Sequence, residues 1–239
     1  ISDEDNGESD AVTIASNVGA TASLKNVFIG DDDLSDDEYF GGDAIFNGTL
    51  AATTVAINAG NVAGENAGAV FVGDATITNL TLTANSANAN TDATAEFQSA
   101  LTATTVTLDD AASNGTAELT INTTNGAQTI AGTIDGAAAG EGTLAVKDDD
   151  DSAAAQAATF SGNIGGSKSL LALNIGTVGG ADDPSSAVFN GTTSATTITL
   201  TAGDAANETG LATFNGNVTA TTINIIGGGD GTADATASF

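Results

Sequence analysis

Carboxylates are the side chains of this sequence best suited to chemistry, and they gather in two clusters. The clusters comprise Asp31, Asp32, Asp33, Asp36, Asp37 and Glu38 in one and Asp148, Asp149, Asp150 and Asp151 in the other. Calcium prefers about six to eight oxygen ligands, which acidic loops can supply. Residues 31–42 do not fit the EF-hand loop, because Asp stands at the sixth position and Gly at the twelfth, where that motif has Gly and Glu. We expect the carboxylates of both clusters to be solvated and to bind no ion, with weak calcium binding as the alternative.

The residue types that most catalytic sites need are absent. The 239-residue chain contains no His, Cys, Met or Trp, and its basic residues number only 3. Without His or Cys there is no zinc site, thiol nucleophile or His-based triad. A polysaccharide-cleaving site would need paired carboxylates, usually with Arg and aromatic sugar platforms, but the chain has one Tyr and no Arg. We therefore predict a protein that is not an enzyme and uses no cofactor unless calcium binds.

The net charge limits the partners and the location. A charge of −28 excludes nucleic acid as a partner, because phosphate binding needs clustered Lys and Arg. No window approaches 18 apolar residues, so we expect no membrane span. The acidic, Thr- and Asn-rich composition is typical of an extracellular or cell-surface microbial protein. The chain opens without an initiator Met or a signal-peptide pattern, so we expect a mature or excised piece of something longer.

A repeat of about 25 residues organises the chain from residue 44 onward. Its markers are Phe46, Phe71, Phe97, Phe160, Phe189, Phe214 and Phe239, at spacings of 25, 26, 63, 29, 25 and 25 residues. An Ala stands two positions before each Phe, and an apolar pair begins nine positions after it in five of six copies, as in Val55/Ile57. In the sixth copy we place the pair two residues late, at Leu171/Leu173, after an insertion at 165–168.

Both halves of the repeat alternate with period two, as strands do. A unit of this length with two short strands cannot close a core alone, but stacked units can. The period is too short for tandem immunoglobulin-like sandwiches, which need about 100 residues each, and no helical periodicity occurs. We therefore predict an all-β fold, a parallel β-helix-like β-solenoid of about 25-residue rungs with the seven Phe residues stacked inside as its structural core.

Two regions are expected. Residues 1–43 form an acidic N-terminal segment with irregular first rungs, and 44–239 form the solenoid array, irregular over 109–159. Turn-rich acidic stretches such as 202–210 should protrude from one edge. Because Phe239 stands in the Phe column of a new rung, we expect the array to continue beyond it. More repeats of the same chain, or copies packed head-to-tail as a filament, would then cover the last strand edge.

Outward Thr residues suggest a further role. Thr197, Thr199 and Thr201 alternate on one expected strand, and Thr105 with Thr107 on another. A flat array of such pairs is the geometry with which ice-binding solenoids order water. The simpler interpretation is that Thr is an ordinary exposed strand residue.

The segments FNGTLAATTVAI (46–57), FNGTTSATTITL (189–200) and FNGNVTATTINI (214–225) carry a family resemblance. They resemble the β-strand repeats of giant bacterial surface proteins, including autotransporter passenger domains of the rickettsial outer-membrane-protein type and surface-layer or adhesin arrays. The resemblance covers roughly residues 44–239. It implies a β-solenoid at the cell surface with a structural or adhesive role, and the family has no shared catalytic residues to carry over.

Three functions therefore stand as hypotheses. The first is a structural extracellular protein, a segment or subunit of a bacterial surface layer, fibre or autotransporter-like stalk. The second is an adhesin or binding module for a host receptor, glycan or ice. The third is a phage tail fibre, for which an obligate trimer would be diagnostic.

Overall fold

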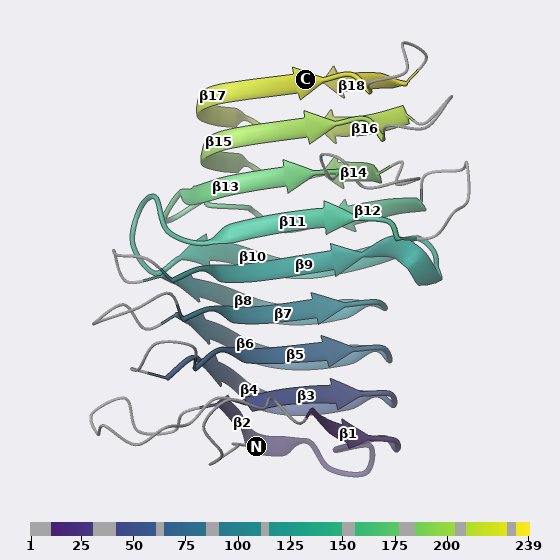
Figure 1. Cartoon of the computed structure of the whole chain (residues 1–239), viewed down its shortest axis with the longest axis vertical. Helices are drawn as coiled ribbons and strands as arrows, with labels where there is room; N and C mark the ends of the chain where they lie inside the picture. The colour runs from purple at the N-terminus through teal and green to yellow at the C-terminus, as the bar shows by residue number, and fades with distance from the viewer. Residues whose placement is uncertain are drawn as a thin grey trace.

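The computed structural model describes residues 11–30, 42–60, 65–84, 91–110, 115–149, 156–176, 185–203, 209–228 and 233–239. Apart from one short 3₁₀ helix, the regular structure of these residues consists of β-strands in two nine-stranded sheets. All strand pairs are parallel, and the coils stack along one axis (Figure 1). The predicted all-β solenoid with coils of about 25 residues is confirmed. The described residues include no helix with the length and apolarity that crossing a membrane requires.

Successive strands alternate between the two sheets, which we call the odd sheet and the even sheet. The odd sheet contains β1 (Val12–Ile14), β3 (Gly42–Phe46), β5 (Ala67–Phe71), β7 (Ala93–Phe97), β9 (Ala117–Asn122), β11 (Thr143–Lys147), β13 (Leu170–Ile175), β15 (Thr193–Thr201) and β17 (Val218–Ile226). The even sheet contains β2 (Leu24–Gly30), β4 (Leu50–Asn58), β6 (Ala75–Thr83), β8 (Leu101–Asp109), β10 (Gln128–Gly136), β12 (Gln156–Phe160), β14 (Ser185–Phe189), β16 (Thr209–Phe214) and β18 (Asp234–Ser238). The 3₁₀ helix η1 (Thr123–Asn125) lies between β9 and β10.

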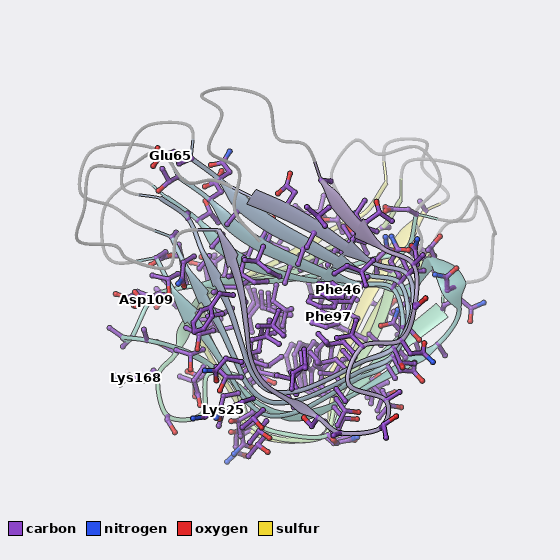
Figure 2. The ribbon with its side chains drawn as sticks, turned by 90° about the horizontal axis from the view of Figure 1, so that it is seen from below. Lys25, Phe46, Glu65, Phe97, Asp109 and Lys168 are labelled. Atoms are coloured by element: carbon purple, nitrogen blue, oxygen red, sulfur yellow. The ribbon has the colours of Figure 1, made fainter. Side chains whose placement is uncertain are left out.

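Each regular coil has three inner faces, because its long strand bends. In β4 the buried residues are Leu50 and Ala52 before the bend and Val55 and Ile57 after it. Two successive residues between these pairs face outward, which breaks the period-two alternation and turns the strand through a corner. The short strand supplies one face and the two halves of the long strand supply the others. The view along the axis shows the side chains converging between these faces (Figure 2).

Phenylalanine rings stack inside the coils in two separate columns. In the first column, Phe46 lies 5.1 Å from Phe71 and Phe71 lies 4.4 Å from Phe97 between ring centroids. In the second column, the successive distances from Phe160 through Phe189 and Phe214 to Phe239 are 4.8, 4.9 and 5.3 Å. These distances match the spacing of neighbouring strands. Six of the seven rings are buried, whereas Phe239 is 68% exposed.

The two columns belong to two blocks of coils that differ in phase. The Phe-bearing short strands β3, β5 and β7 lie in the odd sheet, whereas β12, β14 and β16 lie in the even sheet. Accordingly, Phe97 pairs with Ile121, and Phe160 pairs with Ile130. The irregular region over 109–159 contains this change, through β9, η1, β10 and β11. Each repeat unit above it is displaced by one face relative to the units below it.

This displacement changes where the long strands end. Their ends lie at one corner of the coil in the first block and at a different corner in the second. The acidic segments expected to protrude from one edge, such as 202–210, lie largely outside the described residues, so that expectation stays a prediction.

The inward pair of the sixth copy also differs from prediction. Leu173 pairs with Ile198 and Ile175 with Leu200, and both members of the Leu173/Ile175 pair are buried. Leu171 is 45% exposed, so the predicted pair Leu171/Leu173 is wrong by one alternation step. The inserted turn at 165–168 is longer than the sequence pattern suggested, and it delays the pair by four residues instead of two.

Candidate functional site

The predicted acidic clusters are described only in part. Residues 31–38, Asp150 and Asp151 lie outside the described residues. The expectation of solvated acid is wrong at Asp148, which is fully buried and whose carboxylate accepts a hydrogen bond from the backbone N–H of Gln156 at 3.1 Å. Asp149 pairs with Lys147, Nζ to Oδ2, at 2.9 Å. In the part of the chain that the structure describes, no three His, Cys, Asp or Glu residues are placed to hold a metal ion. Calcium binding stays a prediction.

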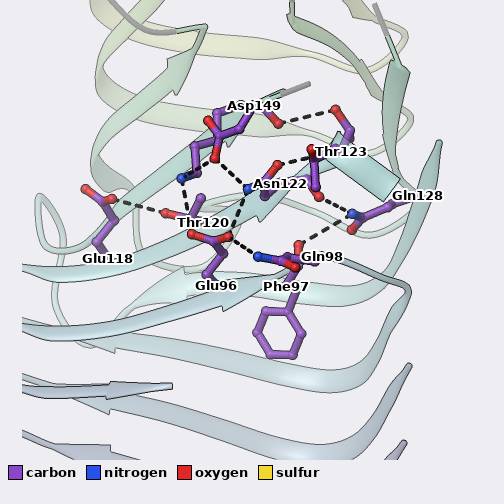
Figure 3. Close-up of polar contacts among 11 residues, drawn as sticks. Glu96, Phe97, Gln98, Glu118, Thr120, Asn122, Thr123, Gln128 and Asp149 are labelled. Atoms are coloured by element: carbon purple, nitrogen blue, oxygen red, sulfur yellow. Dashed lines mark hydrogen bonds and ion pairs between the residues drawn. The ribbon is translucent and has the colours of Figure 1, made fainter. Parts of the chain in front are cut away.

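The main polar cluster of the described residues lies at the phase change, on the outer side of the odd sheet. It joins Glu96 of β7, Asn122 of β9, Lys147 of β11 and Asp149, which follows β11 (Figure 3). Lys147 Nζ lies 3.1 Å from Glu96 Oε2, and Asn122 Nδ2 donates to both Glu96 Oε1 and Asp149 Oδ2 at 2.8 Å. One coil separates Glu96 from Asn122, and one more separates Asn122 from Lys147, so parallel stacking brings them together. We call this set the Lys147 cluster.

Electrostatics favours the charged forms of the Lys147 cluster. Burial opposes ionisation of Glu96, but hydrogen bonds from Gln98 and Asn122 and the charge and hydrogen bond of Lys147 outweigh it, so the pKa of Glu96 is lowered. Burial also opposes the charge on Lys147, but its hydrogen bond to Asp149 and the attraction of Glu96 outweigh it, so the pKa of Lys147 is raised. The cluster is therefore a compensated ion-pair network at neutral pH.

A second set of hydrogen bonds ties this cluster to the chain that changes phase. The Asn122 side chain accepts from the backbone N–H of Thr124 at 3.1 Å and caps η1. The buried Gln128 side chain donates to the backbone carbonyl of Asn122 and, at 3.4 Å, to that of Phe97. Gln128 also pairs with Ala158, which places it at the base of the Ala column of the second block. These hydrogen bonds position the backbone that joins the two blocks.

Two shallow hollows adjoin the Lys147 cluster on the same outer side. One, of about 480 Å³, is lined by residues that include Ala145, Asn174 and Thr199, and the other, of about 380 Å³, by residues that include Gly68 and Thr94. The hollows share Glu118, Thr120 and Lys147 as lining residues. Small outward residues such as Gly68 and Ala145 leave this space. With carboxylates, amides and hydroxyls at its margins, the surface suits a hydroxyl-rich ligand.

The outward Thr residues do not form one array in the described strands. Thr105 and Thr107 belong to β8 in the even sheet, whereas Thr197 and Thr199 belong to β15 in the odd sheet. Within the odd sheet, Thr199 pairs with asparagines on both neighbouring strands, Asn174 and Asn224. The phase change thus divides the flat surface that an ice-binding role would use.

The sequence reasoning missed the Lys147 cluster. One signal was present: Lys147 is among only 3 basic residues and falls in the irregular region, one coil after Asn122. Comparison with known proteins finds no match for this chain among protein-family models, curated proteins or solved structures. The fold and this outer surface are therefore the features from which a function is inferred.

Proposed function

We propose that this chain is a structural module of an extracellular or cell-surface assembly, a stiff segment of a surface layer, fibre or autotransporter-like stalk. The observation that carries the proposal is the continuity of the two nine-stranded parallel sheets along the whole stack of coils. Each coil contacts only the coils next to it and is paired with them strand to strand. Bending or stretching the solenoid would therefore strain these strand pairs, so the pairing resists both.

The inner columns support the same role. The Ala column of the first block continues through Leu119 and Leu144 into Leu173 and Ile198, all of them buried. In the described coils this column of buried residues therefore continues where the repeat changes phase. The net charge of −28 keeps the outer surface hydrated and makes neighbouring rods repel sideways.

Cell-surface location is the testable part of this proposal. Antibodies raised against the chain should label intact cells of the source organism, and brief protease treatment of intact cells should remove the epitope. A cytosolic protein of the same cells serves as the internal control. Labelling that appears only after permeabilisation would contradict the proposal.

A binding module is the second candidate, and the two hollows beside the Lys147 cluster are the observation that favours it. We expect a binding module of this kind to retain a glycan through hydroxyl contacts with Glu118, Asn174 and Thr199. A glycan array probed with the native chain and with Asn174→Leu would test this. Binding that Asn174→Leu leaves unchanged, or no binding at all, would remove the candidate.

A further inference from the structure

Exposed apolar side chains concentrate at the two ends of the described solenoid. Nine large hydrophobic residues among those described are more than a third exposed: Val12, Leu24 and Phe28 in the first coil, Ile223, Ile225, Ile226 and Phe239 in the last, and Leu171 and Leu211 between. Ile198 and Leu200 are each 2% exposed, whereas the residues paired with them in the last coil, Ile223 and Ile225, are 44% and 49% exposed. In the part of the chain that the structure describes, no coil lies above these inward residues.

The strands at both ends also have one free edge each in the described part of the chain. There, β17 pairs with β15 and β18 with β16, while β1 pairs with β3 and β2 with β4. An unpaired strand edge is a template for another strand. The two ends carry opposite edges of the same sheets, so the top of one copy can accept the bottom of another.

The phase change determines how two such ends fit. The first coil has its short strand, β1, in the odd sheet and its longer strand, β2, in the even sheet. The last coil has the reverse, with the nine-residue β17 in the odd sheet and the short β18 in the even sheet. Stacked without rotation, short strands would meet long ones. Rotated by one face, each strand meets its equivalent.

We propose that a second copy of this chain stacks its first coil on the last coil of the copy below, rotated by about a third of a turn. In this contact β1 extends the edge of β18, and β2 extends the edge of β17. The established registers then place Ile14 over Phe239, Val27 over Ile223 and Ile29 over Ile225. The apolar columns therefore continue across the junction as they do between coils of one block.

This contact is head-to-tail and does not close, so it generates a filament with about three copies per turn. The inference rests on the proposed structural function and specifies its partner as a second copy. Each copy carries a charge of −28, so repulsion opposes assembly at low ionic strength. Salt screens charges over about 10 Å at 0.1 M, and filament growth should therefore rise with salt.

Sedimentation velocity of the 239-residue chain across a salt series tests the contact. We expect oligomers to lengthen as salt rises. Ile225→Glu should block the upper end and Val12→Glu the lower end, so each variant alone should remain monomeric, while a mixture of the two should form dimers and nothing larger. Leu171→Glu, at a similarly exposed residue of an interior coil, is the matched control and should assemble normally. A native chain that stays monomeric at every salt concentration would overturn the proposal.

Disulfide trapping tests the rotation. The native chain contains no Cys, so introduced pairs are the only thiols. Directly opposed residues of neighbouring strands lie within the about 4.4–6.8 Å Cα range that a disulfide needs. A double variant with Thr13→Cys and Ser238→Cys should give a ladder of linked copies on oxidation, because both positions face outward on β1 and β18. A variant with Thr13→Cys and Asn224→Cys reports the unrotated contact and should not.

Disulfide-linked copies from the variant with Thr13→Cys and Asn224→Cys, and none from the variant with Thr13→Cys and Ser238→Cys, would refute the rotation. These outcomes are separate from those of the proposed function. A chain that labels on intact cells but never links head-to-tail leaves the surface role standing without this contact. A chain that links head-to-tail but labels only permeabilised cells removes the surface role.

Discussion

Replacing Phe189 with Ala removes a ring that stacks on another Phe on both of its sides in the second Phe column. Phe189 is fully buried and lies between Phe160 at 4.8 Å and Phe214 at 4.9 Å. Truncating a buried Phe to Ala costs about 3–5 kcal/mol, and loss of a ring contact on both sides places this variant toward the upper part of that range. For a chain of this size, about 1 kcal/mol corresponds to about 2–4 °C in Tm. We therefore expect the Tm to fall by about 10 °C or more.

Phe239→Ala is the matched comparison, because it changes the same residue type in the same column. Phe239 is 68% exposed and stacks on one side only, at 5.3 Å from Phe214. Its smaller burial predicts a loss of about 1–1.5 kcal/mol. Thermal melting followed by far-UV circular dichroism, with urea unfolding as a second measure, gives both values under one set of conditions. Equal losses for the two variants would refute the stacked core.

Three further outcomes are expected. Ala212→Leu should overpack the fully buried Ala column of the second block and cost about 1–3 kcal/mol in urea unfolding, whereas the outward neighbour Thr213→Leu should change stability by less than about 0.5 kcal/mol. Because the pKa of Glu96 is lowered and that of Lys147 raised in the folded chain, their pair stabilises the fold at neutral pH. The contribution of this ion pair to stability is lost as pH falls through the Glu96 pKa or rises through the Lys147 pKa. Glu96→Gln should therefore flatten the acid side of a curve of Tm against pH. An unchanged curve would contradict this. Added salt should raise the Tm by screening the acidic surface, and equal effects of calcium and matched magnesium would leave screening as the whole cause.

The repeat made the local structure predictable, but not the way in which its units are arranged around the axis. Period-two alternation and a fixed interval between Phe residues determine strands, coil length and inward side chains. They do not say on which face a given strand lies. The 63-residue gap between Phe97 and Phe160 contains the information: Ile121 comes 24 residues after Phe97, Val146 comes 25 later, and Phe160 only 14 after that. Fourteen residues are too few for a full coil, so Phe160 must lie on another face.

The Lys147 cluster was harder to predict for a related reason. Its members become neighbours only once the coils on either side of the phase change are in register. Lys147 and Asn122 pair directly, but Glu96 belongs to the block below, and Asp149 follows the end of β11. Nothing in the sequence marks a Glu on a short strand as the partner of a Lys about two coils away. Contacts across several coils depend on the stacking geometry, which single-residue patterns do not carry.

The phase change bears on the contact that we propose between copies of this chain. Below it, each coil fills the odd-sheet face with one small and one large residue, as in Ala95 with Phe97. Above it, two medium-sized residues fill the same face, as in Leu173 with Ile175. Between the two arrangements, η1, the Gln128 side chain and the Lys147 cluster contact the backbone and side chains of the coils that join the blocks. The described first and last coils contain no such adaptor. In the proposed contact between copies, equivalent strands would therefore meet directly, which the rotated arrangement achieves.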